Sequence, residues 1–455
     1  MKTLLQPIRE YVRTLRATLV GGWNRFWFTP SDPTTLATIR IVTGLVLLYV
    51  HVTCLADLLN FVGPNAWVDQ EAIVKIRTEA TVPSVLFEGK VHRNYWGQSV
   101  WFYVRNPTAI WAIHGVFLLA IVCFTLGLGS RVAAVLVWLG HLSYLHRGLM
   151  IWFGMDTILA MLTFYLMFAP VGATLSLDRA IGRYRAARRT LRMSGRPDTV
   201  PLATAPHWSV TVVIRLIQVH MCIIYFAAGA AKLQGPTWWS GTATWMTMML
   251  PEFALFDMSW LARLGEWPVQ YVSALGNLFT ILFELSFAFL IWHRLWRPFV
   301  LFMAVLLHAS IGIFMGLGGF GVVMLTGCLA FVAPASVSWL LEHLFKGRSG
   351  YRFVYDRQDS RQVAAASWIY AADSWKQVQV VEIHDRSVGE PGGTLVTPNG
   401  KHAQGLSAFG KLFGALRALW ILWPAAVWAF LRLPRTVATV RQEDTAQEEA
   451  RPVSA

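Results

Sequence analysis

Long apolar runs, separated by shorter polar stretches, dominate most of the chain. A bilayer core of about 30 Å is crossed by roughly 20 mostly apolar helical residues. On that template the sequence predicts eight membrane spans, near 36–55, 108–127, 131–146, 149–170, 209–230, 271–292, 298–316 and 319–341. The third is short, and glycines 316, 318 and 319 separate the last two. The pattern therefore predicts an all-α polytopic membrane bundle.

The two ends of the chain differ from this bundle. Residues 1–28 combine arginines and tryptophans without a continuous apolar core, which predicts an amphipathic interfacial helix rather than a cleavable signal peptide. The transmembrane region then extends over 29–345, and a small separate domain is expected over 350–440. Residues 441–455 are polar, and we expect them to be disordered.

Composition supports a membrane protein. Of 455 residues, 55% are hydrophobic and only 14% charged, with a net charge of +14, whereas a soluble domain carries about a quarter charged residues. The four cysteines are scattered within apolar runs and form no CxxC pair. A disulfide framework and a metal site are therefore not predicted.

Orientation follows from the loops that carry Lys and Arg, which stay cytoplasmic. Segment 171–208 holds seven arginines against two aspartates, and 293–298 adds two more. By contrast, 56–107 has five basic and five acidic residues. With eight spans, we expect a multi-pass protein of the inner (plasma) membrane with both termini cytoplasmic. The arginine run is attributed to topology, and no nucleic-acid partner is predicted.

Several ionisable or polar residues lie inside the predicted spans, where they are costly and are candidates for function. They are Arg40, Asp156, Arg215, Gln218 and Glu284. Arg215 and Gln218 are three residues apart and share a helix face. The structural interpretation is a set of ion pairs, such as Arg40 with Asp156 or Arg215 with Glu284. The functional interpretation is a polar cavity.

The segment from Tyr225 to Leu233 is rich in small residues and ends in Lys232. Small residues let a helix approach its neighbours closely. A lysine kept away from water has a lowered pKa and can act as a neutral general base. The alternative is a lysine whose ammonium group extends to the lipid headgroups. Position alone leaves both interpretations open.

Three stretches give the chain a resemblance to a known family. They are Thr29-Pro30-Ser31-Asp32-Pro33 with residues 36–44, Gly127-Leu128-Gly129-Ser130-Arg131, and Arg215-Leu216-Ile217-Gln218 leading into 225–233 and Gly241. Residues of about 29–335 thereby resemble the HTTM (horizontally transferred transmembrane) domain, which is shared with the membrane region of vitamin K-dependent gamma-carboxylases.

The resemblance implies a site as well as a fold. In those carboxylases the lysine matched by Lys232 is the proposed base that deprotonates vitamin K hydroquinone, so a reduced quinone is the implied cofactor. Asp156 is a second catalytic candidate, next to Met155, which replaces the family's histidine. Candidate substrate-binding residues are Arg40, Arg215, Gln218 and Tyr225. The large lumenal substrate-binding region of the carboxylases is missing here.

The segment 350–440 has the pattern of a small α/β domain. The sequence predicts a strand at 351–356, a helix near 360–373, a strand at 378–383, a hairpin over 394–403 and a helix from Gly405. An irregular tail with an interfacial helix over 416–430 is the alternative.

The predicted order of elements is similar to the thioredoxin-like DCC family, named for its Asp-x-x-Cys-x-x-Cys motif. The matching positions here are Asp356, Asp359 and Gln362, so both cysteines are absent. Because thiol–disulfide exchange needs two thiols, we expect a cytoplasmic domain kept for packing or for binding an unknown protein partner.

Two functions therefore stand side by side. One is a carboxylase-like enzyme that depends on a quinone or another lipid and uses Lys232 as its base. The other is a non-catalytic membrane scaffold, or a protein that binds a lipid or a partner. A transporter is disfavoured, because neither an inverted repeat nor a matching pair of broken helices is detected in the sequence.

Overall fold

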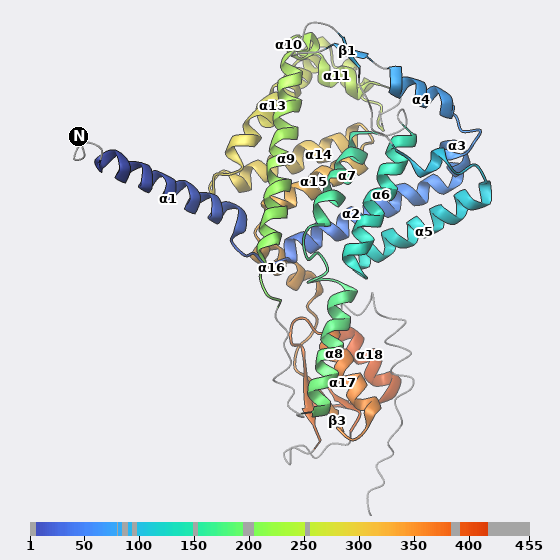
Figure 1. Ribbon diagram of the computed structural model, residues 1–455, viewed down its shortest axis with the longest axis vertical. Coiled ribbons are helices and arrows are strands. Elements are labelled where there is room, and N and C mark those ends of the chain that lie inside the picture. The colour runs from blue at the N-terminus through green and yellow to red at the C-terminus, as the bar shows by residue number, and fades with distance from the viewer. Residues whose placement is uncertain are drawn as a thin grey trace, which may run out of the picture. The chain divides into compact units, whose positions relative to one another are not determined.

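The computed structural model of the protein (Figure 1) describes residues 6–79, 81–83, 90–92, 98–148, 153–193, 204–250, 255–383 and 392–416. The expected disordered tail at 441–455, and all but the first residue of the alternative interfacial helix at 416–430, lie outside these residues. The chain divides into two units. One comprises Met1–Asp178 with Thr204–Val337, and the other Arg179–Ala203 with Ser338–Ala455.

Where it is described, the first unit is helical apart from one short antiparallel pair of strands, β1 (Thr81–Pro83) and β2 (Lys90–His92). Its helices are α1 (Gln6–Phe28), α2 (Thr34–Thr53), α3 (Leu58–Val62), α4 (Gln70–Glu79), α5 (Pro107–Leu126), α6 (Ser130–Arg147), α7 (Gly154–Leu166), α9 (Trp208–Leu233), α10 (Pro236–Trp239), α11 (Ala243–Met248), α12 (Ser259–Arg263), α13 (Glu266–Leu290), α14 (Arg297–Phe314) and α15 (Gly318–Cys328). Helix α8 (Leu177–Met193) begins at the end of this unit, and α16 (Pro334–Phe345) likewise continues into the second.

Within the described residues, five helices are long and apolar enough to cross a membrane. They are Thr34–Val62, Pro107–Leu126, Trp208–Leu233, Glu266–Leu290 and Arg297–Phe314. All eight predicted spans contain helix, but α6, α7 and α15 are not among the five. Helix α7 has 13 residues, which cover about 20 Å at 1.5 Å per residue.

The predicted span 319–341 is wrong as a single helix. Helix α15 ends at Cys328, a turn of 3₁₀ helix covers Leu329–Phe331, and α16 begins at Pro334. Proline has no N–H to donate to the preceding turn and its ring clashes with the carbonyl four residues earlier. Pro334 therefore favours a new helix start at α16 over continuation of α15.

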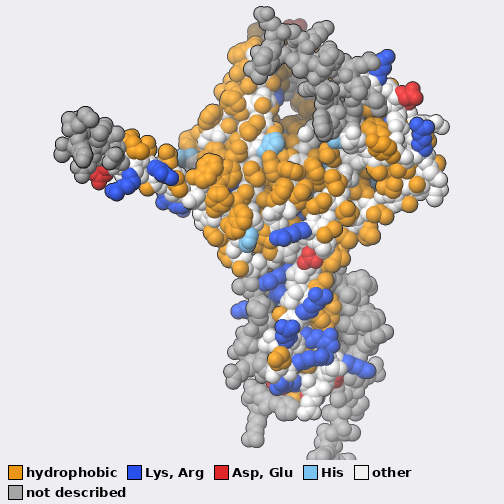
Figure 2. Space-filling model, in the orientation of Figure 1, with side chains coloured by type: hydrophobic (Ala, Val, Ile, Leu, Met, Phe, Trp, Pro, Cys, Tyr) orange, Lys and Arg blue, Asp and Glu red, His pale blue; other side chains and the backbone are white. Residues whose placement is uncertain are grey.

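The helices of the first unit bury one continuous apolar core, which includes Leu36, Ile121, Leu159, Ile217 and Phe287. Apolar side chains also cover much of the outside of this unit, as the orange surface in Figure 2 shows. In water such a surface would be unfavourable. Together with the five long apolar helices, it fits a membrane-embedded protein.

The second unit carries a four-stranded sheet in the order β4-β3-β5-β6. Its elements are α16, β3 (Tyr351–Tyr355), α17 (Ser360–Ala372), β4 (Val378–Glu382), β5 (Thr394–Val396), β6 (His402–Ala403) and α18 (Gly405–Ala415), with most of α8. Strands β3 and β4 are parallel, while β5 is antiparallel to both β3 and β6. The predicted strand, helix, strand, hairpin and helix are all present.

The positions that match the DCC motif make local structural contacts. The Asp359 side chain accepts a hydrogen bond from the backbone N–H of Arg361 at 2.8 Å and caps α17. The side-chain oxygen of Gln362 accepts one from the backbone N–H of Asp356, also at 2.8 Å. These residues therefore stabilise the turn between β3 and α17.

Within the arginine-rich segment 171–208, residues 177–193 form the helix α8. Arg183 of α8 is buried and donates to the backbone carbonyl of Asp373 at 2.6 Å. Leu191 belongs to the apolar core of the second unit. The blue side chains along α8 in Figure 2 therefore lie on a packed helix rather than on a bare loop.

Candidate functional site

An ion pair joins two of the spanning helices at Lys232 of α9 and Glu284 of α13. The Nζ atom of Lys232 lies 2.9 Å from Oε1 and 2.8 Å from Oε2 of Glu284. The lysine side chain is 23% exposed and that of the glutamate 10%. Among the described residues, this is the one salt bridge that connects two spanning helices. Because an isolated charge in apolar surroundings is costly, each residue compensates the other.

Close helix packing places the two residues together. A Cβ atom built on Gly229, one turn before Lys232, would lie only 3.1 Å from the Cβ of Glu284 and 3.0 Å from the side chain of Leu285. The predicted close approach of the small-residue segment is thus confirmed at Gly229. Without that glycine α13 would have to move outwards, and the carboxylate would move with it.

A short helical segment after α9 brings an aromatic ring beside the amine. The side chain of Asn277 on α13 accepts from the backbone N–H of Thr244 at 2.9 Å and donates to the backbone carbonyl of Trp238 at 3.2 Å. Gly241, with φ +78°, allows the turn between α10 and α11. The ring centroid of Trp238 consequently lies 5.3 Å from Nζ of Lys232, within cation–π range.

Tyr225 lies two turns before Lys232 on α9 and is 1% exposed. Its hydroxyl is 2.6 Å from Nε2 of His308 and 3.6 Å from Sγ of Cys328. Its ring packs on Phe287, with centroids 4.1 Å apart. The predicted substrate-binding tyrosine is therefore part of a buried contact between α9, α13, α14 and α15.

Arg215 and Gln218 lie near the other end of α9. Arg215 donates to the side-chain oxygen of Gln218 at 2.8 Å, which confirms that they share a helix face, and to the backbone carbonyl of Phe26 at 3.1 Å. At 1.5 Å per residue, Arg215 lies about 25 Å along the helix from Lys232. The structure therefore does not bring this predicted pair to the lysine.

Asp156 occupies the first turn of α7 and is 1% exposed. Its Oδ2 accepts the backbone N–H of Phe153 at 3.0 Å, so the carboxylate caps the helix. Its backbone carbonyl lies 2.9 Å from Nε2 of His141. Capping accounts for a carboxylate at this position without a catalytic role.

Three buried histidines that sequence reasoning did not group lie together near Asp156. Nε2 of His51 lies 3.2 Å from Nδ1 of His141, and Nδ1 of His114 lies 2.5 Å from the hydroxyl of Tyr144. All three histidines belong to predicted spans, at 36–55, 108–127 and 131–146, where a histidine is itself unusual. Within the described part of the chain, no group of three or more His, Cys, Asp or Glu residues is arranged to hold a metal ion.

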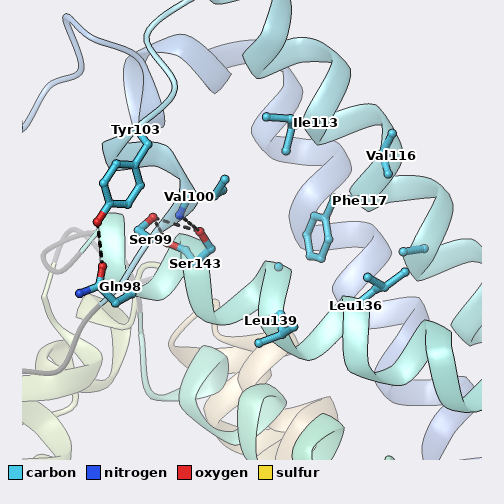
Figure 3. Close-up of a pocket in the computed structure, with 12 residues that line it drawn as sticks. Gln98, Ser99, Val100, Tyr103, Ile113, Val116, Phe117, Leu136, Leu139 and Ser143 are labelled. Carbon is cyan, nitrogen blue, oxygen red and sulfur yellow. Dashed lines mark hydrogen bonds between the residues drawn. The ribbon is translucent and has the colours of Figure 1, made fainter.

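An apolar groove of about 390 Å³ opens between α5 and α6 beside these histidines. Figure 3 shows Phe117 between the two helices, with Leu136 and Leu139 on α6 and the hydrogen-bonded Ser99 and Ser143 at one end. The far side of Phe117 contacts the histidines, because its ring centroid is 4.8 Å from that of His51. The groove is thus closed off from them by one aromatic ring.

Arg40 is fully buried, and its guanidinium makes three short hydrogen bonds to backbone carbonyls. It donates to Phe124 at 2.7 Å, Thr125 at 2.9 Å and Leu175 at 2.5 Å. The first two carbonyls belong to the last turn of α5, where intrahelical donors are missing. This geometry supports a structural role for the predicted substrate-binding arginine.

The same junction explains the glycine-rich segment after α5. The Asp178 carboxylate accepts the backbone N–H groups of Gly129 at 2.8 Å and Ser130 at 2.9 Å, and the Ser130 hydroxyl at 2.6 Å. Partial burial opposes ionisation of Asp178, but these donors outweigh it, with a smaller contribution from Arg40, and hold its pKa below the usual range. Asp178 thereby caps the first turn of α6.

Both ion pairs expected from sequence are wrong. Arg40 binds backbone carbonyls while Asp156 caps α7, and Glu284 binds Lys232 instead of Arg215. The charge of a residue and its depth in a predicted span do not determine which residue on another helix it pairs with. That pairing depends on which helix faces pack together.

The residue pair that remains capable of acid–base chemistry is Lys232 with Glu284. Both side chains can hold a proton, and they are in direct contact. Comparisons with family models, with curated proteins and with solved structures find no match for this chain.

Proposed function

We propose that this chain is a membrane protein of the HTTM type in which Lys232 and Glu284 exchange protons with a lipid-soluble hydroquinone. The observation that carries the proposal is the largely buried, two-oxygen contact between the two side chains. A ligand that binds beside such a pair in apolar surroundings interacts more strongly with its charges than it would in water, because water no longer screens them.

In this proposal a ligand approaches Lys232 from the exposed part of its side chain. An ammonium carries three N–H donors, and the hydrogen bond to Oε1 of Glu284 engages one of them. The 23% exposure of Lys232 leaves the amine accessible. The face of Trp238 at 5.3 Å offers an aromatic surface beside it. A phenolic ring fits this donor set, and Lys232 with Trp238 would hold it.

The protein's part in the reaction is proton transfer at Nζ. Transfer of one proton from Lys232 to Glu284 leaves a neutral amine next to a neutral carboxyl. The amine then accepts a proton from an acidic hydroxyl and returns to its charged form, so the pair gains one proton overall. A bound hydroquinone would supply that hydroxyl.

The remaining candidates have smaller roles in this proposal. Arg40 and Asp156 stabilise helix ends, Tyr225 supports the packing beneath the pair, and Arg215 with Gln218 belongs to a separate pocket. Asp156, with the neighbouring histidines, is not needed for the step at Lys232.

For the rest of the protein we propose an inner-membrane location with both termini cytoplasmic, supported by the basic segments 171–208 and 293–298. The second unit is proposed to be a degenerate thioredoxin-like DCC domain. The parallel pair β3 and β4, followed by antiparallel β5 and β6, supports that assignment. Because Asp359 and Gln362 replace both cysteines, its proposed role is binding a protein partner.

One observation favours a second candidate, a non-catalytic lipid-binding scaffold. Lys232 is already compensated by Glu284, as a purely structural interhelical pair would be. In that case the pair would hold α9 to α13, and no hydroquinone would be consumed.

The test is hydroquinone consumption by the purified full-length chain in detergent micelles. Vitamin K hydroquinone is supplied under air, and its loss is followed by chromatography against a protein-free sample. Lys232→Ala and Lys232→Arg should each lower the rate at least about hundredfold, as expected for loss of a general base. Lys346→Ala is the matched control, because it removes a surface lysine from the Lys346–Glu342 pair.

Binding is measured separately, by mass spectrometry of quinone retained after purification. A Lys232 variant that keeps the wild-type rate would overturn the base. A wild-type protein that is folded but consumes no hydroquinone would favour the scaffold.

A further inference from the structure

A polar pocket lies in the first unit near the N-terminal end of α9, far from Lys232. It has a volume of about 360 Å³. Residues at the end of α1 and just after it, on α9, at the start of α14 and around 330–334 line it, among them Arg25, Thr29, Arg215, Gln218 and Arg297. The pocket thus collects three arginines from three helices that are distant in sequence.

The positive charge of this pocket is not neutralised by the protein. Among the described residues, none of Arg25, Arg215 and Arg297 has a carboxylate oxygen within 4.0 Å. One carboxylate, that of Asp32, also lines the pocket, and its Oδ1 accepts the backbone N–H of Thr34 at 2.8 Å. Three guanidinium groups therefore face a single carboxylate that is engaged elsewhere.

Two of the guanidinium groups are fixed in place before any ligand arrives. Arg215 is held by the Phe26 carbonyl and Gln218, and it lies over the Phe26 ring at 4.4 Å. Arg297 donates to the backbone carbonyls of Ile291 at 3.1 Å and Trp292 at 3.4 Å. Neutral partners orient these groups but leave their charge available.

Holding like charges together costs free energy that an anion recovers on binding. The planar guanidinium group matches the oxygen geometry of phosphate and binds it through paired hydrogen bonds. The space is large enough for a phosphate with its first substituent, and its polar walls disfavour an acyl chain.

We propose that this pocket binds the phosphate group of an anionic membrane lipid. The lipid source follows from the surroundings: Arg25 lies on α1, whose exposed side chains include Tyr11, Leu19 and Trp23. Trp292, 5.8 Å from the Arg215 guanidinium, belongs to the turn after the spanning helix α13. Basic pockets between membrane helices are established sites for anionic headgroups. This proposal does not depend on chemistry at Lys232.

The experiment is native mass spectrometry of the purified full chain, titrated with dioctanoyl phosphatidylglycerol or dioctanoyl phosphatidylcholine. The wild type should bind the anionic lipid at least tenfold more tightly than the zwitterionic one. The double variant R25Q/R297Q should lose that preference. R294Q is the matched control, because Arg294 is exposed in the same turn as Arg297 but does not line the pocket.

Each other outcome decides against part of the proposal. Equal affinity for the two lipids, or an R25Q/R297Q protein that binds like R294Q, would overturn the site. Inorganic phosphate that displaces the lipid at equal concentration would overturn the lipid source and leave a free anion as ligand. If the double variant does not fold, R25Q alone, which changes an exposed side chain, should weaken phosphatidylglycerol binding about threefold or more. No weakening in R25Q would then count against the pocket.

Discussion

The two ends of helix α9 hold cations in opposite ways. At one end Lys232 is in contact with the two carboxylate oxygens of Glu284 and lies beside Trp238. At the other end Arg215 shares a pocket with Arg25 and Arg297 and has only neutral partners. One end is internally compensated, and the other carries excess charge.

This difference separates two kinds of function. A compensated lysine–glutamate pair places a proton donor in contact with a proton acceptor. Uncompensated guanidinium groups keep their protons at every physiological pH and can only attract an anion. Lys232 is therefore the candidate for chemistry and the arginine pocket the candidate for binding.

Arg40 is a third kind of cation, held by backbone carbonyls. Its replacement should cause the largest loss of unfolding stability. Arg40→Met would leave two carbonyls in the last turn of α5, and the carbonyl of Leu175 just before α8, without their charged donor. One of them belongs to Leu175, whose φ of +47° is unfavourable for a side chain. Hydrogen bonds to charged groups contribute about 1.5–3 kcal/mol each, so we expect a loss of about 3 kcal/mol or more.

The free energy of unfolding is measured in mild-detergent micelles by titration with a denaturing detergent. Arg131→Met is the control, since Arg131 is exposed on α6. A fully stable Arg40→Met protein would show that carbonyl partners do not fix this cation, and would reopen its predicted role in substrate binding.

Glu284→Gln tests the compensated end directly. It removes the counter-charge of Lys232 and should destabilise the protein by about 2 kcal/mol, the cost of losing a hydrogen-bonded charged partner. The double variant Lys232→Met with Glu284→Leu should recover most of that stability, because apolar pairs often replace ion pairs well.

The surface pair of Lys346 and Glu342, whose side chains are 42% and 44% exposed, provides the reference. Glu342→Gln should change stability by less than about 1 kcal/mol. If Glu284→Gln and Glu342→Gln behaved alike, burial would not distinguish the two pairs, and a poised proton exchange at Lys232 would lose its basis.

The sequence predicted these regions unequally. Apolar runs located the helices α2, α5, α6, α7, α9, α13, α14 and α15, whereas the shorter α3, α4, α10, α11 and α12 were not predicted. The small residues before Lys232 predicted the close packing at Gly229. The partner of Lys232 was missed, since Glu284 is 52 positions away and its selection depends on how α9 and α13 face each other. The break at Pro334 could have been predicted from the proline rule alone.

The histidines near Asp156 illustrate the same limit. His51, His114 and His141 come from three different helices, so no local spacing links them. The hairpin around Asn399-Gly400 in the second unit was predictable from its turn residues, although the pairing of Thr397 with Lys401 makes its loop three residues long.

Gly229→Ala should destabilise the protein less than Glu284→Gln does. A Cβ at this position would lie 3.0 Å from Leu285 and 3.1 Å from the Cβ of Glu284, so α13 must shift by a few tenths of an ångström. We expect a loss of about 1 kcal/mol from overpacking. Gly115→Ala on α5 is the control, because its Cβ would meet nothing within 4 Å. The glycine-to-alanine gain in helix propensity should make that control neutral or slightly more stable.

The smallest effect on the lipid-free protein is expected at the uncompensated end. Arg25 is exposed and its side chain belongs to no salt bridge among the described residues, so Arg25→Gln should change unfolding stability by less than about 0.5 kcal/mol. With phosphatidylglycerol at ten times its dissociation constant, the wild type should gain about 1.4 kcal/mol by mass action, and Arg25→Gln should gain clearly less at the same concentration. A variant that is as unstable as Glu284→Gln without lipid would mean that Arg25 is a structural residue. The contrast between the two ends of α9 would then be one of packing rather than of free charge.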